Sequence, residues 1–175
     1  MLLTNFRQNS DWFYLITAVL VIDLIVIILT KYPGANPTFK VNSLNEWYTR
    51  FTSTAVASDV LSILIGIMVT RYIYTILHLK NPLLFFAILI LVQVCHDILF
   101  YTQVIQRLPD GYNEMIDVFK GYAKENGAYI LLADGMMMVS SVLLASLLKV
   151  SEDHITTTTL MITLYSLTYI IYTRG

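Results

Sequence analysis

The 175-residue chain has little charge and almost no cysteine, and each shortage excludes a class of protein. Asp, Glu, Lys and Arg make up 13% of its residues, whereas soluble domains contain about 25%. The net charge of −1 provides no basic patch of the kind that marks a nucleic-acid partner. Cys95 is the only cysteine, so the sequence excludes an intrachain disulfide and a CxxC thiol–disulfide exchange site.

Signatures of catalysis and of lipid anchoring are also missing. The sequence contains no HExxH, paired-histidine or DxD-type motif. It has neither an N-terminal Met-Gly nor a C-terminal CaaX box. The first apolar run is longer than the core of a cleaved signal peptide, so we expect it to stay as a span. We therefore assign no catalytic residue, and the sequence leaves metals and cofactors open.

Long apolar stretches are what the chain does contain. It is 57% hydrophobic, with a mean hydropathy of +0.66. A helix needs about 20 apolar residues to cross the hydrocarbon core of a bilayer. The sequence predicts one all-α domain over residues 1–175, a bundle of about five transmembrane helices. The predicted spans are residues 12–30, 54–74, 82–104, 128–148 and 155–173.

Five spans place the two termini on opposite sides of the membrane, and we call the N-terminal side A. The opposite side, B, then carries the long loops 31–53 and 105–127. Lys and Arg number four on side A and seven on side B, which favours side B facing the cytosol. Arg71 and Lys80 on side A are interpreted as interface charges. The two long loops are the predicted contact surfaces for a protein partner.

Residues 111–126 have the periodicity of an amphipathic helix that is too polar to cross a membrane. Asp110 is its predicted N-cap and Gly127 its predicted C-cap. We expect this helix to lie in the side-B interface or over the mouth of the bundle. Its candidate contact residues are Tyr112, Glu114, Asp117, Phe119, Lys120, Tyr122 and Glu125.

Four aspartates, Asp23, Asp59, Asp97 and Asp134, lie inside predicted spans. A rise of 1.5 Å per residue from each span centre places all four in the side-B half. Each shares a helix face with small or polar residues, so we expect these faces to pack together and the acids to converge. The predicted polar cluster is Asp23, Asp59, Gln93, His96, Asp97, Tyr101, Asp134 and Ser141.

Two details of this cluster are predicted from helix geometry. Asp97 is expected to bond to Gln93 or Tyr101, each one turn away. Residues that are adjacent in a helix point about 100° apart. His96 is therefore expected to reach an acid of another helix rather than to pair with Asp97.

A carboxylate in the membrane costs about 2.5–3.5 kcal/mol on insertion scales, so it is normally paired, hydrated or functional. The favoured interpretation is that the acids hydrogen-bond across helices and hold the bundle in register. The alternatives are a transport or proton-relay pathway, a metal or catalytic site, and a binding site for lipid or a partner protein.

Four segments resemble an uncharacterised family of multi-span membrane proteins encoded by large nucleocytoplasmic DNA viruses. They are LNEWYTRFTSTAVASDVL (44–61), QVCHDILFY (93–101), NEMIDVFKGYAKENG (113–127) and LLADGMMM (131–138). The similarity covers about residues 20–172 and brings no catalytic signature. It implies a viral membrane protein, in the internal membrane of a virion or in a host membrane.

These observations support three functional hypotheses. The leading one is a non-enzymatic integral membrane protein of a viral particle or of the membranes that build it. The second is a small proton- or cation-coupled transporter or channel that uses the intramembrane acids. The third is a membrane enzyme that acts on a lipid substrate.

Overall fold

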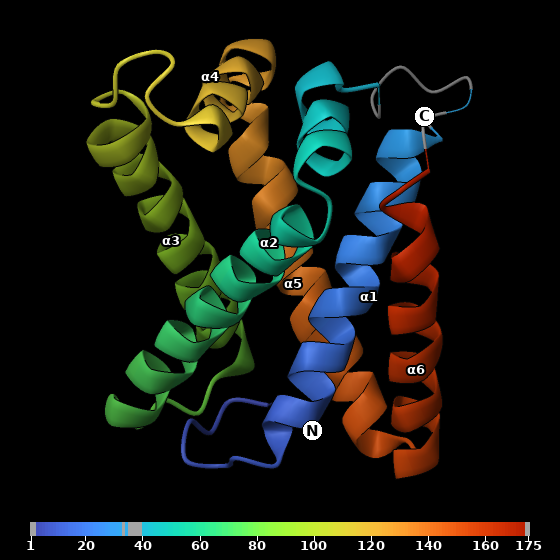
Figure 1. The fold of residues 1–175 in the computed structure, drawn as a ribbon. Helices are drawn as coiled ribbons and strands as arrows, with labels where there is room; N and C mark the ends of the chain where they lie inside the picture. Colours follow the sequence, from blue (N-terminus) through green and yellow to red (C-terminus); the bar gives the residue numbers. More distant parts are fainter. Residues whose placement is uncertain (1–2, 33, 35–39, 174–175) are drawn as a thin grey trace.

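The computed structural model describes residues 3–32, 34 and 40–173, and all regular structure within them is helical. The prediction of an all-α chain is confirmed. The elements are α1 (Asp11–Lys31), α2 (Asn42–Ile76), α3 (Pro82–Phe100), a π-helical turn η2 (Tyr101–Ile105), α4 (Glu114–Asn126), α5 (Tyr129–Val150) and α6 (Asp153–Ile170) (Figure 1).

Within the described residues, four helices are long and apolar enough to cross a membrane. They are α1, α2, α3 extended by η2, and α5, and they coincide with the first four predicted spans. The chain is therefore a transmembrane protein. α6 covers most of the fifth predicted span, but it is not one of the four helices that are apolar enough to cross a membrane.

α6 lies beside α1 and runs in the same direction (Figure 1). The two helices are joined at both ends. The Tyr14 hydroxyl donates to the Asp153 carboxylate at 2.8 Å, and the Lys31 ammonium donates to the Thr173 carbonyl at 2.6 Å. α6 therefore extends along the full length of α1.

α2 is bent at Thr52, whose backbone has φ 46° and ψ −118°. These dihedral angles are not helical, so they divide α2 into two straight helical segments. A β-branched residue rarely adopts positive φ. Residues 54–76 match the second predicted span. Residues 42–51 form a separate helical arm at the side-B end, and the prediction that they are loop is wrong. Tertiary packing explains the difference, because the arm buries Trp47 and Tyr48.

α4 begins three residues later than predicted. Asn113 is its N-cap, since the Asn113 carboxamide oxygen accepts from the backbone N–H groups of Met115 and Ile116 at 2.9 and 3.2 Å. The prediction of Asp110 as the cap is wrong, because Asp110 instead binds the Lys120 ammonium. The predicted C-cap is confirmed at Gly127, which has φ 52°.

The core consists of two apolar clusters, one toward each side of the bundle. The side-A cluster includes Val19 of α1 and Ile63 of α2, and the side-B cluster includes Ile27 of α1 and Ala55 of α2. On both helices an aspartate lies between the two clusters in sequence. The fold thus leaves a polar layer between two apolar ones.

Candidate functional site

The structure brings the four intramembrane acids into this polar layer. Asp23 of α1 is fully buried, whereas Asp59 of α2, Asp97 of α3 and Asp134 of α5 are half-buried. Asp59 lies close enough to Asp23 to interact electrostatically, and Asp134 lies close enough to Asp59 and Asp97. The acids therefore form a continuous row from α1 through α2 and α5 to α3.

Two acids of this row bind the helical arm. The Tyr48 hydroxyl donates to Asp23 Oδ1 at 3.3 Å. The Trp47 indole N–H donates to both oxygens of Asp59, at 3.0 and 3.3 Å. Consecutive arm residues thus reach acids on two different helices. Trp47 and Tyr48 were not predicted as members of the cluster, because aromatic residues near a span end indicate only the interfacial belt.

Asp97 is held by its own helix. The Gln93 side-chain amide donates to Asp97 Oδ1 at 2.8 Å, as one of the two predicted alternatives requires. His96 Nδ1 lies 3.1 Å from the same oxygen, so the prediction that these neighbours do not pair is wrong. Their side chains turn toward each other from adjacent helical positions. Among the described residues, the Tyr101 hydroxyl makes no hydrogen bond to the Asp97 carboxylate, and Tyr101 is 41% exposed.

Asp134 differs from the other acids, because no hydrogen bond to its carboxylate exists among the described residues. Asp97 and His96 of α3 and Asp59 of α2 lie close enough to Asp134 to interact with it electrostatically. Ser141, two turns along α5, is fully buried and its hydroxyl has no partner within the described part of the chain.

Helix α4 covers the side-B end of this layer (Figure 1). Its Phe119 ring lies 4.7 Å from the Trp47 ring, measured between centroids. Burial raises the pKa of Tyr122, and the nearby charges of Asp134, Asp59 and Asp97 raise it further. Tyr122 therefore lies within range of three of the four acids.

Glu125 joins α4 to the beginning of the arm. Its carboxylate accepts from the backbone N–H groups of Asn42 and Ser43, each at 2.9 Å, and from the Ser43 hydroxyl at 2.7 Å. Burial acts to raise the pKa of Glu125, but these hydrogen bonds together lower it. The arm and α4 consequently form one connected cap, which we define as residues 42–51 and 114–126.

The remaining residues predicted for the amphipathic helix form ion pairs and hydrogen bonds at the rim of the cap, with one exception. Glu114 pairs with Arg50 of the arm at 3.1 Å, and Asp117 accepts from the Gly111 backbone N–H at 3.0 Å. Lys120 donates to the Leu108 carbonyl at 2.6 Å and pairs with Asp110, which lowers the pKa of that carboxyl. Tyr112 lies before the helix begins and is 76% exposed, so its predicted place within the helix is wrong.

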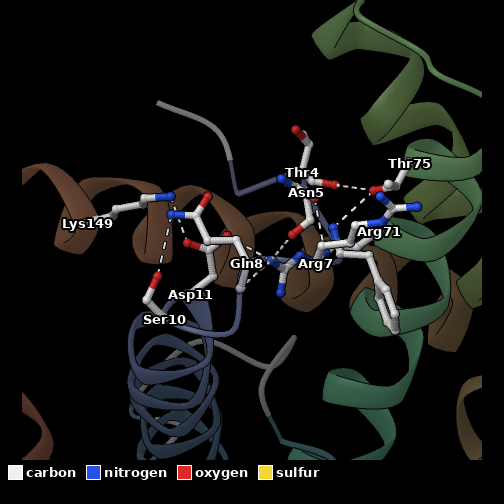
Figure 2. Close-up of polar contacts among 10 residues, drawn as sticks. Thr4, Asn5, Arg7, Gln8, Ser10, Asp11, Arg71, Thr75 and Lys149 are labelled. Carbon is white, nitrogen blue, oxygen red and sulfur yellow. Dashed lines mark hydrogen bonds and ion pairs between the residues drawn. The ribbon is translucent and has the colours of Figure 1, made fainter.

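A second polar cluster, which the sequence did not predict, lies at the side-A end. Arg71 of α2 is fully buried and its Nη2 donates to Asp11 Oδ2 at 2.7 Å. Lys149 of α5 donates to Asp11 Oδ1 at 2.7 Å. Asp11, at the start of α1, thus links three helices (Figure 2). Arg71, interpreted from the sequence as an interface charge, is thus buried within an ion cluster of the protein.

The N-terminal segment closes over this ion cluster. Arg71 Nη2 also donates to the backbone carbonyls of Asn5 and Gln8, and the Phe6 backbone N–H donates to the Thr75 hydroxyl at 3.0 Å (Figure 2). The guanidinium lies over the Trp12 ring, 5.7 Å from its centroid. One feature of the sequence could have predicted this cluster: Asp11, Arg71 and Lys149 all lie at the side-A ends of predicted spans.

The chemical range of the acid layer is limited. Among residues 3–32, 34 and 40–173, no three His, Cys, Asp or Glu side chains are placed to hold a metal ion. Carboxylates, an imidazole and hydroxyls can still hydrogen-bond, exchange protons and attract monovalent cations. Comparison with known protein families, with curated proteins and with solved structures finds no match for the chain.

Proposed function

We propose that this protein is a non-enzymatic, multi-pass membrane component of a viral particle or of the membranes that build it. In this proposal the intramembrane acids serve the architecture. The observation that carries it is the pair of hydrogen bonds from Trp47 and Tyr48 to Asp59 and Asp23. In this proposal Asp59 and Asp23 hold the cap in place, and the cap presents the side-B surface to a partner.

The physical argument rests on where the donors come from. A buried carboxylate without a donor costs several kcal/mol, so a donor that reaches it is held firmly. Here both donors lie on the arm, beyond the break at Thr52. The two acids therefore fix the direction of the arm relative to α1 and the rest of α2. In the same proposal α6 is a fifth span, which places the termini on opposite sides.

Tyr48→Phe tests the architectural role. The variant keeps the ring but removes the donor to Asp23, so we expect the free energy of unfolding to fall by about 1–3 kcal/mol. Amide hydrogen exchange in the cap should rise more than exchange in α1. Tyr129→Phe is the matched control, since Tyr129 is 79% exposed and should tolerate the change. Unchanged stability and unchanged cap exchange for Tyr48→Phe would contradict the proposal.

The viral location is supported by the resemblance of residues 20–172 and is tested separately. Quantitative proteomics of purified particles should find the chain at the copy number of a structural membrane protein. Its absence from particles and from the membranes of infected cells would remove this part of the proposal while leaving the architectural part intact.

A second candidate function, proton- or cation-coupled transport, is favoured by Asp134. This carboxylate lies within electrostatic range of Asp97 and His96, has no hydrogen-bond donor among the described residues, and is half-buried. In proteoliposomes, a transporter should lose ion flux on Asp134→Asn or Asp97→Asn. Glu152→Gln is the control, because Glu152 is an exposed acid at the side-A end. Equal leak from the wild type and all three variants would exclude this candidate.

A further inference from the structure

A groove of about 330 Å³ lies at the side-B end of the molecule, between η2 and α4. Binding sites for small ligands are typically about 300–1,000 Å³. Two chain segments form its walls, and the lining residues are Tyr101, Ile105, Gln106, Lys120, Ala123 and Lys124. The groove is distinct from the acid layer, which none of these side chains joins by a hydrogen bond.

The wall contributed by η2 is shaped by a π-helical turn. The Gln106 backbone N–H donates to the Tyr101 carbonyl, five residues earlier, at 2.9 Å. A π-turn widens the helix and is often found at functional sites. Both Tyr101 and Gln106 line the groove, so this turn sets the position of a hydroxyl and an amide on one wall.

The opposite wall carries positive charge. Lys120 and Lys124 are one turn apart on α4, so both can face the groove. Lys120 is neutralised by Asp110. Lys124 is exposed, and no carboxylate of the described residues lies within 4 Å of it. The groove therefore retains an uncompensated ammonium group beside hydrogen-bond donors, which is the chemistry that recognises a phosphate.

The surroundings of the groove indicate which kind of phosphate compound it binds. The groove lies at the side-B end of α3 and η2, which together are long and apolar enough to cross a membrane. Ile105 and Ala123 add apolar wall that a dissolved anion would not require. Side B carries the excess of Lys and Arg, and cytosolic leaflets are rich in anionic lipid. We propose that this groove binds the headgroup phosphate of an anionic phospholipid from the side-B leaflet.

In the proposed complex Lys124 supplies the charge, while Gln106 and Tyr101 donate to phosphate oxygens. Ile105 and Ala123 contact the glycerol and the first acyl carbons. This proposal is independent of the proposed function, because a transporter and a virion component would equally sit among anionic lipids. It requires only that side B is the leaflet where such lipids are available.

The test uses the full-length protein purified in detergent. Phosphatidylserine, phosphatidylcholine and inorganic phosphate are titrated separately, and the bound species are counted by native mass spectrometry. We expect the wild type to retain phosphatidylserine in preference to phosphatidylcholine. Lys124→Gln should weaken phosphatidylserine binding about fivefold, as expected for one basic residue at a membrane surface.

Two further variants make the outcome decisive. Lys124→Arg keeps the charge and should bind like the wild type, and Lys80→Gln removes an exposed lysine from side A and should also bind like the wild type. Gln106→Leu should weaken binding without any change of charge. Equal retention of phosphatidylserine by Lys124→Gln, Lys80→Gln and the wild type would overturn the site. Inorganic phosphate that binds as tightly as phosphatidylserine would overturn the lipid as its ligand.

Discussion

Arg71 is fully buried, although it lies near the end of a membrane-crossing helix where a long basic side chain usually reaches water. The buried charge is stabilised because the guanidinium donates hydrogen bonds to Asp11 and to two backbone carbonyls. Lys149 balances the second oxygen of Asp11. A buried ion pair is costly to break, since removing one partner leaves the other charge uncompensated.

Arg71→Met should therefore be strongly destabilising. We expect the free energy of unfolding in mixed detergent micelles to fall by about 3–5 kcal/mol, because Asp11 loses its main buried partner. Arg50→Met is the matched control, since Arg50 pairs on the surface with Glu46 and Glu114 and should cost no more than about 1 kcal/mol. A similar small effect for both variants would show that the side-A cluster does not stabilise the fold.

At the scale of single elements, the break in α2 determines how the acid layer is covered. A straight α2 would carry Trp47 and Tyr48 away from the bundle along its own axis. The turn at Thr52 instead directs them onto Asp59 and Asp23. The local conformation is unfavourable for threonine, and it persists because the hydrogen bonds and the buried aromatic rings of the arm outweigh the strain.

Thr52→Gly tests this account of the break. Glycine adopts positive φ without a steric penalty, so relief of about 1–3 kcal/mol of strain should exceed its entropic cost. In detergent micelles, we expect the variant to unfold at a higher concentration of denaturant than the wild type. Thr54→Gly, two residues later in regular helix, should instead lose about 0.5 kcal/mol, because threonine is itself a weaker helix former than alanine. Destabilisation of equal size at both positions would contradict the strained turn.

The contact between α4 and the arm should depend on pH. Hydrogen bonds lower the pKa of Glu125 in the folded state, so its contribution is complete above the unfolded value of about 4.5. That contribution is lost as the pH falls through the lower, folded pKa. The difference in unfolding free energy between the wild type and Glu125→Gln should shrink across this range. Glu114→Gln removes an exposed acid of the same helix that pairs on the surface with Arg50, and it should show a smaller difference at neutral pH. A difference for Glu125→Gln that stays constant with pH would contradict this role.

For the whole molecule, the place of α6 decides the topology. It is parallel to α1 and joined to it at both ends, yet this threonine-rich helix is not among the four that are apolar enough to cross a membrane. Threonine hydroxyls need not remain unpaired in a membrane, because they can bond to carbonyls of their own helix. Thr157 and Thr163 do so, to Asp153 and Thr159, at 3.0 and 2.7 Å.

Single-cysteine labelling distinguishes five spans from four. On a Cys95→Ser background, Gln8→Cys and Thr173→Cys should react with an impermeant thiol reagent from opposite sides of a sealed vesicle. Lys80→Cys and Tyr112→Cys serve as references for sides A and B. Labelling of Gln8→Cys and Thr173→Cys from the same side would mean that α6 does not cross the membrane.

The sequence by itself determined the helices. Hydropathy and the 3.6-residue period are local properties, so the predicted spans agree with α1, α3, α5 and the straight part of α2. Counting along these spans predicted that the four acids lie in the same half of the membrane. The end of α4 at Gly127 was equally predictable, because glycine readily takes the positive φ that ends a helix.

Only the tertiary structure decided which groups meet. The partners of Asp23 and Asp59 lie on an arm that bends against the local preference of Thr52, and no local pattern predicts a conformation that distant contacts stabilise. Asp11, Arg71 and Lys149 are separated by 60 residues or more along the chain. Their convergence depends on the rotation and tilt of three packed helices, which hydropathy and periodicity do not specify.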